Sequence, residues 1–262
     1  MGNRNYLIIT EGEKDEKNVF ETIFEKYGFN IVNVKQKMNI DNIGQFEKIN
    51  YKLESSNIVL IQGPRNRIHD VLKLFDERTD SIERAFSFPY GFFAGIFLVY
   101  DVDHNNNEDV ERMFNKFQDE VTGMLLLSSP CFEVIGDYNL DRKEARYTRL
   151  KEYKKDLNNY YGNNYQTSTI QYIANNFDKL IIRFLKENVS EFGSKNVMEH
   201  PSFIVKKINE MNIRYNAINK EESYVLYRYF STVIYVAIAQ ANNLTKEIDN
   251  YSTVLEFFLK YS

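Results

Sequence analysis

The stretch YLIITEGEKDEKNVF (6–20) sets the fold class. Its apolar residues 6–9 are typical of a buried strand, and they lead directly to Glu11 and Gly12. Residues 13–29 then place apolar side chains at helical spacing. A strand followed at once by an amphipathic helix is the building unit of an α/β sheet. The stretch therefore predicts a strand that ends at a carboxylate, a turn permitted by glycine, and a helix.

The alternation of strand and helix continues to about residue 140. Helical periodicity recurs at 68–77 and 108–121, and further apolar strands are predicted at 30–35, 57–64, 96–100 and 124–128. Such alternation predicts a mainly parallel sheet flanked by helices. Later stretches are long, amphipathic or apolar, and lack strand and turn signals. We therefore expect an α/β domain over residues 1–140, followed by a helical region over 141–262.

The composition restricts the class of protein. The chain has 262 residues, 43% hydrophobic and 27% charged, as in a globular protein that buries a core. A net charge of -4 provides no global basic field, so a polyanionic partner requires a local basic patch or metal ions. The single cysteine, Cys131, leaves no internal disulfide and fits a reducing cytosol. No signal peptide or membrane-length apolar run is evident, so we expect a cytoplasmic protein without a membrane partner.

Acidic residues stand at the ends of three predicted strands. Glu11 ends the first, Asp101 and Asp103 end another, and Glu133 follows the last. Functional residues of open α/β sheets collect at the carboxyl ends of the strands. Asp101 and Asp103, two apart in an extended segment, point the same way and can share one ion. Because clustered carboxylates repel one another unless a cation neutralises them, we expect Glu11, Asp101 and Asp103 to bind Mg²⁺ or Mn²⁺.

These acidic residues also have a structural interpretation. Asp101 and Asp103 can simply begin a loop or cap the next helix, because Asp and Asn commonly do so. Glu133 can be a solvated residue at a strand end. Asp15 and Glu16 are interpreted as residues at a helix N-terminus, where the helix dipole favours negative charge.

The order of the motifs resembles the Toprim domain, the metal-binding α/β module of topoisomerases, bacterial primases and OLD-family nucleases. IITEGEKDEKNVF (8–20) resembles its first motif and FLVYDVD (97–103) its second. LLLSSPCFEVIGDY (125–138) resembles the Ser-x-Pro-x-Phe-Glu stretch of small bacterial RloB and OLD-like Toprim proteins, which are associated with phage defence. The RloB-type motif usually continues into a Trp-Leu-like helix and a His, whereas this chain continues with Val134, Ile135, Gly136 and Asp137.

The resemblance implies a nuclease that hydrolyses phosphodiester bonds of DNA or RNA, tRNA included, with one or two divalent ions. Asp101 and Asp103 would be metal ligands, and Glu11 a ligand or a general base. Glu133 would be a catalytic residue beside a second metal. The chain contains no G-x-x-x-x-G-K-[ST] signature of ATP binding, so we expect a partner ATPase to control an antiphage effector of this kind.

Two basic segments are candidates for binding nucleic acid. Arg65 and Arg67 follow a predicted strand, where they can hold phosphate oxygens or be ordinary surface arginines. DRKEARYTRLKEYKK (141–155) interleaves basic residues with tyrosines that can stack on bases, although its acidic residues also suit a plain solvent face. Its candidate contacts are Arg142, Lys143, Arg146 and Arg149. The apolar run at 224–240 predicts a buried helix or a homodimer contact.

Two other functions fit the same residues. An Asp-x-Asp nucleotidyl or glycosyl transferase would use Asp101 and Asp103 to hold a metal-bound diphosphate. A non-catalytic Toprim-like module would instead bind a protein partner through its helical half. We rank the module last, because an acidic cluster without a ligand costs stability.

Overall fold

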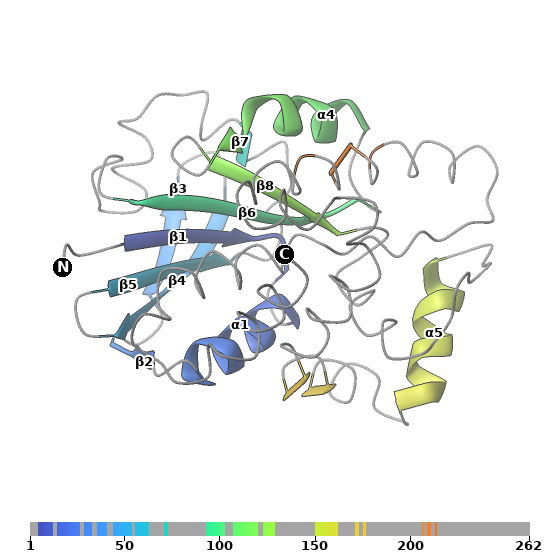
Figure 1. Cartoon of the computed structure of the whole chain (residues 1–262), viewed down its shortest axis with the longest axis horizontal. Coiled ribbons are helices and arrows are strands. Elements are labelled where there is room, and N and C mark those ends of the chain that lie inside the picture. The colour runs from blue at the N-terminus through green and yellow to red at the C-terminus, as the bar shows by residue number, and fades with distance from the viewer. Residues whose placement is uncertain are drawn as a thin grey trace, which may run out of the picture. The chain divides into compact units, whose positions relative to one another are not determined.

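The computed structural model describes a core of elements and a few helical pieces of the C-terminal half (Figure 1). The described residues are 5–12, 15–26, 29–32, 36–40, 44–53, 56–62, 71–72, 93–102, 107–119, 123–128, 150–161, 171–172, 175–176, 206, 209–210 and 213. The strands are β1 (Asn5–Thr10), β2 (Asn30–Ile31), β3 (Gln36–Ile40), β4 (Gly44–Leu53), β5 (Ser56–Gln62), β6 (Gly95–Asp101), β7 (Gln118–Asp119) and β8 (Gly123–Ser128). The helices are α1 (Asp15–Lys26), α4 (Asn107–Lys116) and α5 (Leu150–Tyr161).

Within the described residues, eight strands form one mixed sheet. Its order is β2-β4-β5-β1-β6-β8-β7, and β3 pairs with β4 outside this path. The middle strand β1 is parallel to both β5 and β6. Strand β4 is antiparallel to β2, β3 and β5, and β7 is antiparallel to β8. The expected α/β class is therefore confirmed, with a parallel core, whereas the flanks of the sheet are antiparallel.

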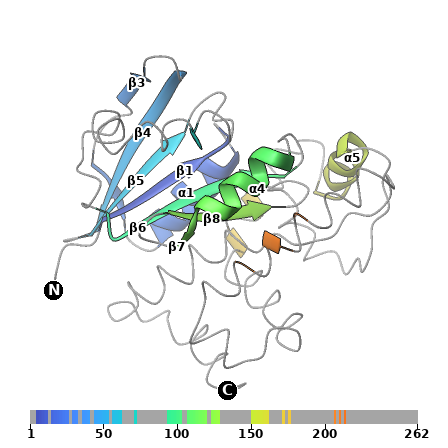
Figure 2. The same ribbon diagram turned by 90° about the horizontal axis from the view of Figure 1, so that it is seen from above.

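The apolar runs identified in the sequence are the central strands. All residues of β1 and β8, and residues 95–100 of β6, are buried. A strand covered on both faces has no need of polar alternation, so it appears as a continuous apolar run. Helix α1 lies alongside β1, β4 and β5, and α4 lies alongside β7 and β8 (Figures 1 and 2). The side chains of Phe24 on α1 and Tyr51 on β4 pack edge to face, with ring centroids 4.9 Å apart.

Two parts of the sheet differ from the sequence prediction. Strand β2 spans only residues 30–31 of the predicted strand 30–35, and the hairpin of β3 and β4 was not predicted at all. The predicted helix over 108–121 ends at Lys116, and β7 follows it. Gly123, the pairing partner of Asp119 on β7, has a φ of 130° that suits glycine, and its missing Cβ leaves room for the buried Phe117 ring.

The chain folds as two compact units. Unit 1 comprises Met1–Tyr100 and His104–Leu125, and unit 2 comprises Asp101–Asp103 and Leu126–Ser262. The described residues beyond 140 are all helical, and α5 buries Tyr153 and Leu157. The predicted boundary between residues 140 and 141 lies outside the described residues and stays a prediction. Among the helices that the structure describes, none is long and apolar enough to cross a membrane.

Candidate site at the carboxyl ends of the central strands

The order of the strands identifies a switch point between β1 and β6. After β1 the chain passes through α1 to strands on the β5 side of the sheet, and after β6 it passes through α4 to β7 and β8 on the other side. In open α/β sheets, ligands bind beyond the carboxyl ends of the strands at such a point. Glu11 directly follows β1, and Asp101 is the last residue of β6. Two of the predicted acidic residues therefore stand at the ends of the two strands that flank the switch point.

Glu11 is held by the sheet although it lies beyond β1. Its backbone N–H donates to the carbonyl oxygen of Val99 on β6 over 3.1 Å, so the parallel ladder extends one residue past Thr10. The Thr10 hydroxyl donates to the Gly12 carbonyl oxygen over 3.1 Å and fixes the start of the turn. Glu11 itself is partly exposed. The backbone of Glu11 is thus ordered by the fold, and its carboxylate keeps access to solvent.

Gly12 has a different role from the one that its sequence context suggests. Its φ does not lie in the left-handed region, so the turn does not require glycine for its conformation. A Cβ at this position would collide with the Glu16 carboxylate group, whose carbon Cδ would lie 2.7 Å away. Glu16, in the first turn of α1, is only 6% exposed. The absent side chain of Gly12 therefore makes room for the carboxylate of Glu16. The helix dipole accounts for a carboxylate in the first turn of α1, but it does not account for the burial of this one.

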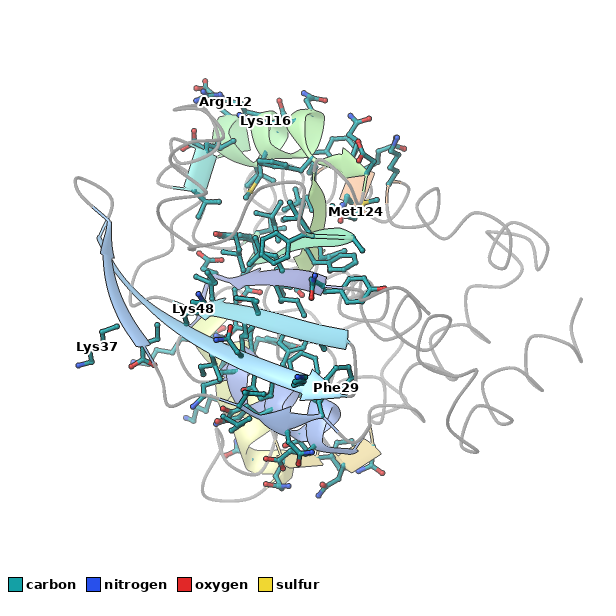
Figure 3. All side chains as sticks on the ribbon, turned by 90° about the vertical axis from the view of Figure 1, so that its left-hand side faces the viewer. Phe29, Lys37, Lys48, Arg112, Lys116 and Met124 are labelled. Atoms are coloured by element: carbon teal, nitrogen blue, oxygen red, sulfur yellow. The ribbon has the colours of Figure 1, made fainter. Side chains whose placement is uncertain are left out.

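A buried lysine on β4 is a second residue that the sequence does not single out. Lys48 pairs with Ile61 of β5, and Ile61 pairs with Ile9 of β1, so Lys48 lies level with the carboxyl end of β1. It is 5% exposed, and this burial lowers the pKa of its ammonium group. Figure 3 labels it on β4. Lys48 occupies the face of β4 opposite to Tyr51, because side chains alternate along a strand.

In unit 2, the end of β6 is joined to the end of β8. The Val102 N–H donates to the Ser128 carbonyl oxygen over 3.0 Å. The Leu127 N–H donates to the side-chain oxygen Oδ1 of Asn209 over 3.3 Å, and Asn209 is buried. A residue 82 positions later in the chain therefore satisfies a backbone group of β8. Asp101, at this end of β6, is partly exposed.

The other predicted site residues lie outside the described residues. They are Asp103, Glu133, Arg65, Arg67, Arg142, Lys143, Arg146 and Arg149. Their roles in metal or nucleic-acid binding stay predictions. Within the part of the chain that the structure describes, no group of three or more His, Cys, Asp or Glu side chains is arranged to hold a metal ion.

Comparison with known proteins adds little about function. No family model matches the chain, and no curated protein does. The crystal structure of a hypothetical protein from Pyrococcus horikoshii OT3 is similar, with a TM-score of 0.39 and 20% sequence identity. The likeness covers 70% of this chain and 95% of that one. These values identify neither a family nor an activity.

Proposed function

We propose that the protein is a nuclease that uses Mg²⁺ or Mn²⁺ to hydrolyse phosphodiester bonds in DNA or RNA. The observation that carries the proposal is Asp101, a partly exposed carboxylate at the carboxyl end of the buried central strand β6. In open α/β sheets, ligands bind beyond the carboxyl ends of the strands. The resemblance of the surrounding motifs to the Toprim domain supports the same function.

The donor set fits a hard divalent cation. Carboxylate oxygens are the ligands that Mg²⁺ and Mn²⁺ prefer, and Asp101 with Asp103 would hold the ion. Such an ion polarises a phosphate and lowers the pKa of a bound water. For Glu11, at the end of β1, we keep the two roles that the Toprim resemblance implies, a metal ligand or a general base.

Cleavage of supercoiled plasmid and of total tRNA, each with Mg²⁺, Mn²⁺ or EDTA, tests the function. We expect metal-dependent cleavage of one substrate, reduced about 100-fold or more in Glu11→Gln and Asp101→Asn. The matched control is Glu25→Gln, which changes an exposed glutamate on α1 and should cleave as the wild type does. Equal cleavage by all three variants would contradict the site. No cleavage together with no binding of Mn²⁺ would contradict the function.

The Toprim resemblance alone supports two further parts of the proposal. One is that a partner ATPase controls the nuclease, and the other is that the system acts against phages. Both concern how the nuclease is controlled and what it acts against, and the cleavage experiment tests neither of them.

A further inference from the structure

Ser128 carries a buried hydroxyl group that the fold leaves unused. It is the last residue of β8 and has no exposed surface. Its Oγ finds no hydrogen-bond partner within the described part of the chain. Burying a hydroxyl group without a partner costs free energy, so such groups are few in native proteins and commonly mark a missing water, ion or ligand.

The backbone hydrogen bonds place Ser128 beside Asp101. In the parallel ladder of β1 and β6, the Glu11 N–H donates to the Val99 carbonyl oxygen, and the residue before the donor, Thr10, is the pairing partner of Val99. The bond from the Val102 N–H to the Ser128 carbonyl has the same form, and β6 and β8 are neighbours in the sheet. Since β6 and β8 also run in the same direction (Figures 1 and 2), the same relation makes Asp101 the ladder neighbour of Ser128. Neighbouring residues on adjacent strands lie about 5 Å apart and point to the same face.

Two backbone groups at this end of β8 have hydrogen-bond partners within the described residues. The Ser128 carbonyl oxygen accepts from the Val102 N–H, and the preceding N–H, that of Leu127, donates to Asn209. Among the described groups of β8 at this end, the Ser128 hydroxyl is the donor without a partner, and its ladder neighbour Asp101 carries a partly exposed carboxylate. A serine hydroxyl can donate one hydrogen bond, and an oxygen bound to a cation is a strong acceptor for it.

We propose that the Ser128 hydroxyl donates a hydrogen bond to an oxygen bound to the cation at Asp101. That oxygen belongs to a water when the cation is alone and to a phosphate group when a nucleotide is present. Ser128 is thus a positioning residue for the cation's outer ligands. The inference rests on the proposed function, since it requires the cation at Asp101.

The test compares Ser128→Ala with the wild type in two measurements. Calorimetric titration gives the affinity for Mn²⁺, alone and with a nucleoside monophosphate, and thermal denaturation gives the stability of the metal-free protein. We expect the Mn²⁺ affinity to fall about fivefold in at least one of the two titrations, as for one lost hydrogen bond. The melting temperature without metal should stay within about 2 °C of the wild type or rise, because the hydroxyl has no partner to lose.

A matched control is available on β4. The side-chain oxygen Oδ1 of Asn50 is also buried without a hydrogen-bond partner in the described residues, and Asn50 lies away from the carboxyl end of β8. Asn50→Leu removes this group at similar volume. Its Mn²⁺ affinity should equal that of the wild type in both titrations.

The outcomes separate this inference from the proposed function. If Asp101→Asn abolishes Mn²⁺ binding but Ser128→Ala binds as the wild type does, the inference is wrong and the metal site stands. If Asp101→Asn binds Mn²⁺ as the wild type does, both are wrong. A melting temperature lowered by more than about 4 °C in Ser128→Ala, with unchanged affinity, would assign the hydroxyl to a buried water of the fold and overturn the inference.

Discussion

The contact between Gly12 and Glu16 makes a prediction that does not depend on any function. In Gly12→Ala, the new methyl group would stand 2.7 Å from Cδ and 2.8 Å from Oε1 of Glu16, whereas ordinary contacts begin at 3.4 Å. The Glu16 side chain must therefore withdraw from a buried position or the turn must shift. Because all of these atoms are the far end of a flexible side chain, the cost falls at the low end for overpacking, about 1 kcal/mol.

For a chain of this length, that cost lowers the melting temperature by about 2–4 °C. A double-mutant cycle followed by thermal denaturation isolates the cause. In a Glu16→Ala background the methyl group meets no carboxylate, so Gly12→Ala should cost nothing or stabilise by up to about 1 kcal/mol through the unfolded state. The expected coupling between the two positions is about 1 kcal/mol.

Two results would refute this reasoning. If Gly12→Ala destabilises the Glu16→Ala protein as much as it does the wild type, glycine is needed for the backbone and not for the carboxylate. If Gly12→Ala leaves the wild-type melting temperature unchanged, Glu16 does not occupy the space beside Gly12.

Three further predictions concern the polar groups of the sheet. The Tyr51 hydroxyl donates to Glu21 over 2.9 Å, so Tyr51→Phe should cost about 2 kcal/mol in urea denaturation at pH 7. Burial, and after it the charge of Glu21, raises the pKa of Tyr51 above its ordinary 10.0, so the tyrosine ionises in unfolded chains before it does in folded ones. The wild type should therefore lose stability above pH 10 faster than Tyr51→Phe does. Parallel profiles of stability against pH would contradict this. Because burial lowers the pKa of Lys48 below its ordinary 10.5, folded chains lose this proton before unfolded ones do, and the wild type should gain stability relative to Lys48→Met as the pH rises toward 10.5. Parallel profiles of melting temperature against pH would contradict this. Asn209→Ala should cost about 2 kcal/mol, because it leaves the buried Leu127 N–H without an acceptor. Asn209→Asp keeps an oxygen at this position and should cost less. Equal losses in denaturant midpoint by the two variants would argue against the hydrogen bond.

Much of the core could be predicted from local pattern. The strands β1, β6 and β8 are buried on both faces, so each appears as an apolar run, and α1 appears as apolar residues at helical spacing. The same patterns put Glu11 and Asp101 at strand ends. Strands β3 and β4 were missed because the lysine, glutamate and asparagine residues of 36–53 interrupt any apolar run.

The sequence by itself thus determined the fold class, the central strands and the acidic residues at their ends, because these depend on burial and on neighbours along the chain. Tertiary structure decided which strand ends are neighbours, since the order β5-β1-β6-β8 depends on pairings between distant segments. It also decided that Gly12 makes room for Glu16, that Lys48 lies level with the end of β1, and that Ser128 stands beside Asp101. Each of these depends on the register of one strand against another, and no local pattern encodes a register.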